Sequence, residues 1–131
     1  LKDFSEEDET TDVCLIIEEK KVFFAKSILA VRSPVFKAMF YREFKEKDKT
    51  EIELPDVQYN DFISFLNVVC GSAREITDES VEGVLRIADR FQAISILEIA
   101  EDYLIFNSKH FTAKKLILSD LYRLDTLQVS S

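Results

Sequence analysis

The side chains best suited to chemistry in this sequence are two cysteines, Cys14 and Cys70, and a single histidine, His110. A cysteine nucleophile needs a neighbouring base, and a structural zinc ion needs about four cysteine or histidine ligands. Both cysteines lie in apolar runs, and His110 stands between Lys109 and Phe111 with no second histidine. We therefore expect two reduced, buried thiols, no metal site and no catalytic site.

Binding of a cation or of a nucleotide phosphate is not indicated either. The acidic run from Glu6 to Glu9 lacks the spaced ligands and the turn glycine of a calcium loop, so solvated surface charge is the better interpretation. The chain holds only two glycines, Gly71 and Gly83, too few for a phosphate-binding loop. The sequence thus predicts neither an enzyme nor a bound cofactor.

Length and composition are typical of one compact domain, because 131 residues, 47% of them hydrophobic, can bury an ordinary core. The formal net charge is -8, which repels phosphate backbones and anionic membranes and argues against a nucleic-acid partner. The sequence has neither an apolar run of about 20 residues nor an N-terminal signal pattern. We expect a cytoplasmic or nuclear protein.

The strand pattern is concentrated near the start. The β-branched run at residues 13–17 and the apolar run at 22–24 flank a charged segment, which predicts a β-hairpin. Residues 51–54 alternate charged with apolar side chains, as a half-exposed strand does, and Pro55 ends that pattern.

Helical spacing dominates the rest of the chain. Ser33 followed by Pro34 predicts a helix start, with serine as the N-cap and proline in the first turn. A further helix precedes this one, from Lys26 on. We expect Gly71 to end a later helix in the left-handed conformation and Thr77 to cap the next.

Two further features concern the hairpin and the segment before it. Asp12 opens the first strand and Lys26 follows the second, so the hairpin brings opposite charges together at its open end. An exposed pair worth about 0 to 1 kcal/mol and a functional contact both remain open interpretations. Leu1 and Phe4 stand three residues apart, before an acidic, solvated stretch at 5–12, and would share one face of a short helix if the chain continues upstream.

Five segments, in this order, resemble the BTB/POZ family: Asp12–Ile17, Phe24–Ala30, Ser33–Phe40, Ile52–Val57 and Leu85–Asp89. The resemblance covers about residues 12–106 and leaves residues 1–11 as an acidic lead-in. Residues 107–131 resemble the C-terminal helical extension of MATH-BTB proteins, particularly nematode ones. It implies an α+β fold, a helical cluster flanked by a small β-sheet with extra C-terminal helices. A MATH domain outside this chain would bind the substrate.

The resemblance also implies a homodimer that serves as adaptor to a cullin-3 ubiquitin ligase. Such adaptors carry a hydrophobic residue, any residue and then glutamate after the helix that here holds Met39 and Phe40. Phe44, Lys45 and Glu46 fit that pattern. Phe44 would offer an aromatic anchor and Glu46 an orienting charge. The resemblance therefore assigns cullin binding to four residues, Met39, Phe40, Phe44 and Glu46.

A second set of residues matches the family's dimer region. Asp12 and Lys26 correspond to a charged pair near the dimer groove, and Leu1 and Phe4 fall where relatives often place a dimer helix. The alternative is an oligomerising scaffold or transcriptional-regulator module that binds no cullin. It stays open because Ala25 replaces a frequent histidine and residues 69–71 lack a tyrosine that helps form the cullin surface.

Overall fold

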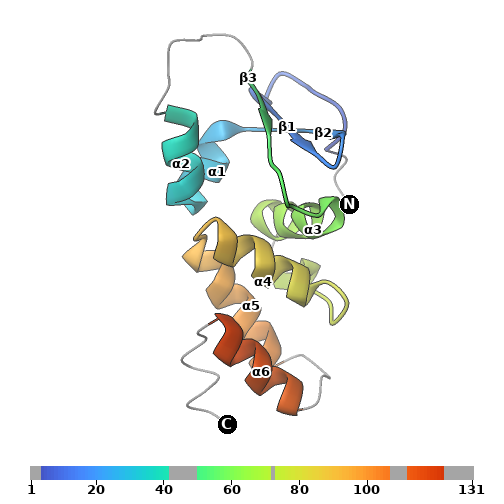
Figure 1. The fold of residues 1–131 in the computed structure, drawn as a ribbon, viewed down its shortest axis with the longest axis vertical. Helices are drawn as coiled ribbons and strands as arrows, with labels where there is room; N and C mark the ends of the chain where they lie inside the picture. Colours follow the sequence, from blue (N-terminus) through green and yellow to red (C-terminus); the bar gives the residue numbers. More distant parts are fainter. Residues whose placement is uncertain (1–3, 42–49, 72, 107–111, 123–131) are drawn as a thin grey trace.

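The fold is a small sheet followed by a column of helices. The computed structural model describes residues 4–41, 50–71, 73–106 and 112–122. Figure 1 shows the sheet and the first two helices at one end of an elongated molecule, with the later helices leading to the other end. The described residues thus confirm the expected α+β class. Their elements, in chain order, are β1 (Val13–Ile17), β2 (Lys20–Phe24), α1 (Lys26–Arg32), α2 (Pro34–Tyr41), β3 (Thr50–Glu53), α3 (Tyr59–Cys70), the 3-10 helix η1 (Ala73–Glu75), α4 (Val81–Arg90), α5 (Ile94–Phe106) and α6 (Thr112–Tyr122).

The sheet has the strand order β2-β1-β3. β1 and β2 form the predicted antiparallel hairpin, in which Val13 pairs with Phe24 and Ile17 with Lys20. β3 joins β1 in parallel, with Leu15 opposite Ile52. The second strand begins two residues earlier than the apolar pattern indicates, because exposed Lys20 continues the ladder without entering the core.

The hairpin turn is strained. Glu18 and Glu19 form its two-residue loop with φ of 50° and 66°. A two-residue loop with both φ values positive favours Asn-Gly, since most side chains disfavour the left-handed region. The Glu18 carboxylate offsets part of this cost by accepting the Tyr59 N–H at 2.7 Å, which ties the turn to the start of α3.

Replacing Glu19 with glycine should therefore stabilise the protein by about 1 kcal/mol, since the relief of left-handed strain exceeds the added entropy of the unfolded chain. Urea denaturation measures the change. Glu9→Gly is the matched control, because Glu9 is exposed and its φ is not positive. An equal or larger gain in the control variant would contradict the explanation.

Aromatic rings form the centre of the core where α2, α3 and the end of α4 meet. The Phe36 ring stacks on that of Phe91 with centroids 4.3 Å apart, and it meets Phe62 edge-on at 6.1 Å. All three side chains are buried. The core therefore joins the first helix pair to the later helices through these rings.

Ser33 confirms the predicted N-cap and adds a tertiary contact. Its Oγ accepts the Phe36 N–H at 3.0 Å, so it satisfies one free amide at the start of α2. The same hydroxyl donates to the Phe91 carbonyl, and Ser33 is buried. One side chain thus caps α2 and fastens it to the end of α4.

The expectations for the ends of α3 and α4 have different outcomes. Gly71 does follow α3, but its φ is −102°, so the predicted left-handed cap is wrong. Its N–H simply continues the helical pattern by donating to the Asn67 carbonyl at 2.8 Å. The N-cap position of α4 itself is Ser80, without a side-chain cap bond, whereas Thr77 caps the turn just before the helix: its Oγ1 accepts the Ser80 N–H at 3.1 Å and its carbonyl accepts the Val81 N–H at 2.9 Å.

Candidate functional site

The residues assigned to cullin binding lie partly outside the described structure. Phe44 and Glu46 fall in the segment 42–49, which the structure does not describe. Met39 is half-buried on α2, whereas Phe40 is buried and stacks on Phe36 at 5.4 Å. Of the two described residues, Met39 is the one that reaches the surface, and Phe40 helps to hold α2 in place.

Of the residues assigned to the dimer region, Phe4 lies in the chain's own core. Leu1 is outside the described residues. Phe4 is buried, its ring lies 5.8 Å from that of Phe24, and its carbonyl accepts the Phe23 N–H at 2.8 Å. Phe4 is in no helix. The structure therefore uses this side chain to anchor the acidic lead-in against β2, and a dimer contact by Phe4 stays a prediction.

Asp12 and Lys26 do come together at the open end of the hairpin. The Asp12 carboxylate accepts the Lys26 backbone N–H at 2.7 Å, and the Asp12 N–H donates to the Phe24 carbonyl at 3.0 Å. The local N-cap, Ala25, has no side-chain acceptor, so a carboxylate from 14 residues earlier caps α1 instead. No local sequence rule finds a cap supplied from so far away.

An apolar surface that the sequence reasoning missed lies on α1 and at the start of α5. Its members are Ile28, Val31 and Ile94, which are 44%, 83% and 60% exposed. The two helices are in contact, and Arg32 Nη1 donates to Ser95 Oγ at 3.2 Å beside these side chains. We call these three residues the α1–α5 face. The spacing of Ile28 and Val31 shows that they share a helix face, but only the structure shows that this face is uncovered.

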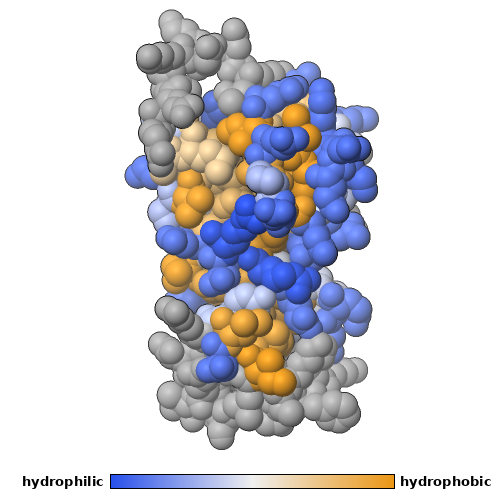
Figure 2. Space-filling model, viewed as in Figure 1, coloured by the Kyte–Doolittle hydropathy of each residue, from blue (hydrophilic) through white to orange (hydrophobic). Residues whose placement is uncertain are grey.

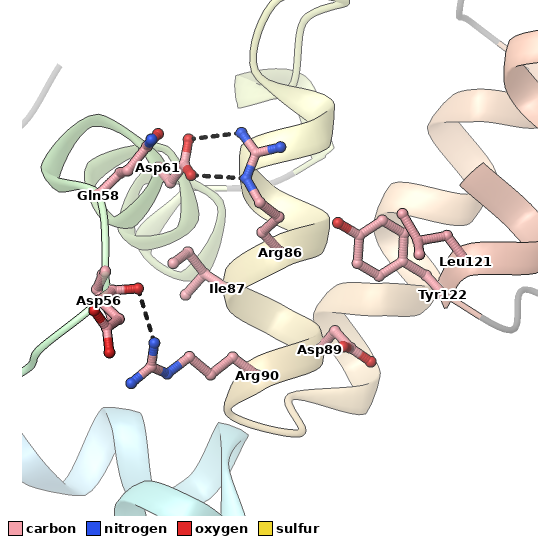
Figure 3. Close-up of a pocket in the computed structure, with 10 residues that line it drawn as sticks. Asp56, Gln58, Asp61, Arg86, Ile87, Asp89, Arg90, Leu121 and Tyr122 are labelled. Carbon is pink, nitrogen blue, oxygen red and sulfur yellow. Dashed lines mark hydrogen bonds and ion pairs between the residues drawn. The ribbon is translucent and has the colours of Figure 1, made fainter. Parts of the chain in front are cut away.

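A groove of about 450 Å³ lies between the β3–α3 link, α4 and α6, and we call it the α6 groove. Figure 3 shows Arg86 and Arg90 reaching from α4 toward the α3 side, with Tyr122 on the opposite side. The residues that line it are Asp56, Val57, Gln58, Asp61, Arg86, Ile87, Asp89, Arg90, Leu121 and Tyr122.

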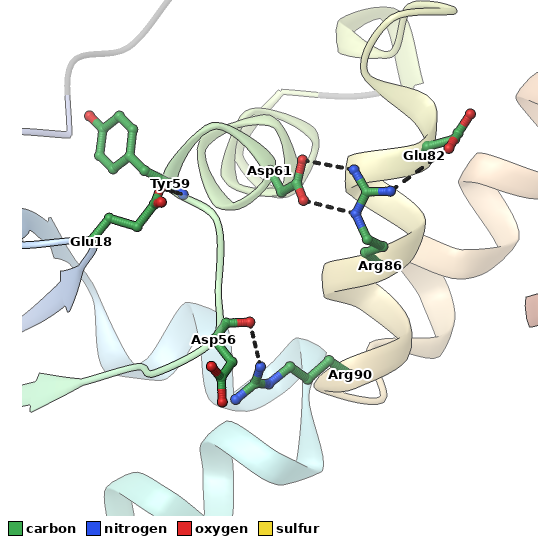
Figure 4. Close-up of polar contacts among 7 residues, drawn as sticks. All are labelled: Glu18, Asp56, Tyr59, Asp61, Glu82, Arg86 and Arg90. Carbon is green, nitrogen blue, oxygen red and sulfur yellow. Dashed lines mark hydrogen bonds and ion pairs between the residues drawn. The ribbon is translucent and has the colours of Figure 1, made fainter.

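Both arginines of the α6 groove are held by contacts within the chain (Figure 4). Asp61 accepts two hydrogen bonds from Arg86, at 2.9 and 3.3 Å, which raises the pKa of the guanidinium. Arg90 donates to the backbone carbonyls of Pro55 and Asp56, each at 2.8 Å. Burial raises the pKa of the Tyr122 hydroxyl, so it stays protonated at neutral pH.

The groups with potential for chemistry are dispersed. Cys14 and Cys70 are both free thiols; Cys14 is buried, as expected, but the expectation for Cys70 is wrong because it ends α3 at the surface. Burial and the nearby Glu51 raise the pKa of the Cys14 thiol. His110 lies outside the described residues. No cluster of three or more potential metal ligands occurs in the described part of the chain.

None of the helices within residues 4–41, 50–71, 73–106 and 112–122 has the length and apolar character required to cross a bilayer.

Comparison with known proteins assigns the family. The BTB/POZ domain model matches residues 1–108. "BTB and MATH domain-containing protein 36" of Caenorhabditis elegans is 40% identical over 90% of this chain and 37% of its own length. "BTB and MATH domain-containing protein 38" of the same species is 35% identical over 91% of this chain and 31% of its own length. A mouse relative, "TD and POZ domain-containing protein 3", is 36% identical over 90% of this chain and 33% of its own length.

This chain therefore spans roughly a third of the length of these relatives. Among solved structures, the BTB domain of human Gigaxonin superposes with a TM-score of 0.60 at 16% identity over 73% of this chain and 79% of its own. The BTB domain of zebrafish PATZ1 gives 0.58 at 21% identity over 72% and 75%. These two likenesses concern the fold alone. The family itself is shown by the matching family model, with the three related sequences in agreement: the chain belongs to the BTB/POZ domain family, whose members are protein-interaction modules.

Proposed function

We propose that this domain homodimerises and links a substrate-binding domain elsewhere in the full-length protein to a cullin-3 ubiquitin ligase, in the cytoplasm or nucleus. The observation that carries the proposal is Phe44-Lys45-Glu46, which matches the adaptor pattern and begins three positions after the last residue of α2. Support comes from relatives whose names pair a BTB with a MATH domain. The substrate would be recognised outside this chain.

The α1–α5 face is the surface best suited to a dimer. Single exposed apolar side chains are ordinary on protein surfaces. Three exposed apolar side chains on two contacting helices form a surface whose burial against a partner is favourable. A two-fold axis would place the same face of both copies together. Dimerisation would present two substrate-binding domains to one ligase assembly and so raise the effective substrate concentration.

Light scattering on the domain alone and mixed with a cullin-3 N-terminal fragment tests the adaptor function. We expect the wild type to be a dimer that binds cullin, and Phe44→Ala/Glu46→Ala to remain a dimer with cullin affinity reduced by at least about tenfold, as when an anchor residue is lost. Val31→Glu is the matched control, because it places a charge on the α1–α5 face. It should produce a monomer that still binds cullin. A wild-type domain that forms no cullin complex would overturn the proposal.

The second candidate function is an oligomerising scaffold or transcriptional-regulator module without cullin. Two residues favour it: Ala25 stands where the family often has histidine, and exposed Cys70 ends α3 in a segment without the tyrosine of many adaptors. This candidate predicts a dimer that forms no cullin complex in the same experiment.

A further inference from the structure

The acidic lead-in is tied to the core at Phe4 and is exposed directly after it. Phe4 is buried, its ring lies 5.8 Å from that of Phe24, and its carbonyl accepts the Phe23 N–H. From Ser5 to Thr10 every residue is exposed, and this segment belongs to no helix or strand. Figure 1 shows the segment as a loop beside the hairpin, and Figure 2 shows a mostly hydrophilic surface on that side of the molecule. Ser5 is therefore an exposed hydroxyl residue next to a buried anchor.

The residues after Ser5 form the pattern that an acid-directed protein kinase recognises. Glu6, Glu7 and Asp8 follow it directly, and Ser5 is the one serine or threonine of the sequence that three acidic residues follow without a break. A kinase of this class has a basic substrate cleft, so consecutive carboxylates bind there by charge complementarity. The cleft takes its substrate as an extended chain, and an exposed segment outside helices and strands reaches that form at little cost.

Two other hydroxyl residues with acidic neighbours are less suited to a kinase. Thr77 precedes Asp78, but its hydroxyl accepts the Ser80 N–H in the turn before α4. Thr50 precedes Glu51 but belongs to β3, which pairs with β1. A kinase would have to open part of the domain to reach either of them, whereas it reaches Ser5 without opening the sheet or the helices.

A phosphate on Ser5 would add negative charge where carboxylates already gather. Burial is the main reason that the pKa of the Cys14 thiol is raised, and the charges of Glu51 and Glu7 raise it further, so Glu7 lies near β1. Lys21 lowers the same pKa, but its ammonium already lies 3.4 Å from the Glu51 carboxylate. A phosphate carries a charge of about −1.5 to −2 at neutral pH, so repulsion by the carboxylates outweighs attraction by this lysine.

We propose that Ser5 is a phosphorylation site for an acid-directed protein kinase and that its phosphate releases Phe4 from β2. The γ-phosphorus of ATP bonds to Ser5 Oγ, its bond to the ADP oxygen breaks with the electron pair left on ADP, and the hydroxyl proton passes to a base of the kinase. Release removes the acceptor of the Phe23 N–H and uncovers the outer edge of β2. The inference goes beyond the proposed adaptor function and uses none of the residues assigned to cullin, so either proposal can fail alone.

Incubation of the full chain with casein kinase 2, ATP and Mg²⁺, followed by mass spectrometry, tests the modification. We expect one phosphate on Ser5 and none on the Ser5→Ala variant. Glu6→Gln/Glu7→Gln should lower the rate of incorporation by about tenfold, because it removes two of the charges that the kinase cleft binds. Glu53→Gln/Glu98→Gln makes the same charge change at exposed positions of β3 and α5 and should leave the rate unchanged.

Hydrogen exchange of the Phe23 amide measures the release of Phe4. Successive residues of an antiparallel strand point their N–H groups to opposite sides, so the Phe23 amide reports on Phe4 and the Val22 amide on the pairing with β1. We expect the phosphate to speed exchange at Phe23 about fivefold without changing Val22, and to do so less at high salt because the charges are exposed. Phe4→Ala is the positive control, since it should speed exchange at Phe23 without any phosphate. Thermal melting verifies that this variant is folded.

The two parts of the proposal can be refuted separately. A chain that takes up no phosphate, or takes it up at another residue, would show that Ser5 is not the site. Unchanged or slower exchange at Phe23 in the phosphorylated chain would show that the phosphate does not release Phe4. Equal acceleration at Phe23 and Val22 would mean that the whole hairpin is destabilised, which also contradicts a specific release.

Discussion

Replacing Ser33 with alanine is expected to lower the free energy of unfolding by about 2 to 3 kcal/mol. The change removes the N-cap bond to the Phe36 amide, which contributes about 1 kcal/mol in typical helices. It also removes the donor to the Phe91 carbonyl at a buried position, where an unmade hydrogen bond costs about 1 to 3 kcal/mol. Urea denaturation followed by circular dichroism measures the loss.

Two variants separate the contributions of Ser33. Glycine is tolerated as an N-cap but has no hydroxyl, so Ser33→Gly isolates the cost of the lost Phe91 bond. Ser80→Ala removes a hydroxyl that accepts the Thr77 N–H at 2.9 Å in an exposed turn, and we expect a loss below about 1 kcal/mol. The tertiary role of Ser33 would be refuted by equal losses for Ser33→Ala and Ser80→Ala.

Replacing Gly83 with alanine is expected to destabilise the domain by about 1 to 3 kcal/mol, although alanine is the better helix former. A Cβ at position 83 would lie 2.5 Å from Asp61 Oδ1 and 3.3 Å from Asp61 Cα. The Asp61 carboxylate cannot swing aside freely because it accepts both hydrogen bonds from Arg86. The close approach of α3 and α4 therefore depends on the absence of a side chain at Gly83.

A double-mutant cycle tests this explanation. In an Asp61→Ala background the clashing carboxylate is gone, so Gly83→Ala should cost close to nothing, a coupling of about 1 to 3 kcal/mol. Thermal or urea unfolding of the four proteins gives the coupling. If Gly83→Ala costs the same in both backgrounds, the α3 backbone rather than the carboxylate sets the helix spacing.

The sequence by itself determined the features that depend on neighbouring residues. The hairpin follows from two apolar runs around a charged turn, and the start of α2 follows from Ser33 and Pro34. The order of such segments was enough to indicate the BTB/POZ family, and the match over residues 1–108 confirms it. These signals are readable because a cap, a turn or an alternating strand is specified within a few positions.

Only the tertiary structure decided which faces are covered. Helical spacing grouped Ile28 with Val31 but did not show that both side chains are exposed. In the same way, the apolar run around Cys70 did not show that this thiol lies at the surface. The Asp12 cap on α1 and the α6 groove combine residues that are distant in the sequence. Periodicity identifies the residues that share a face, whereas burial depends on which distant element packs against that face.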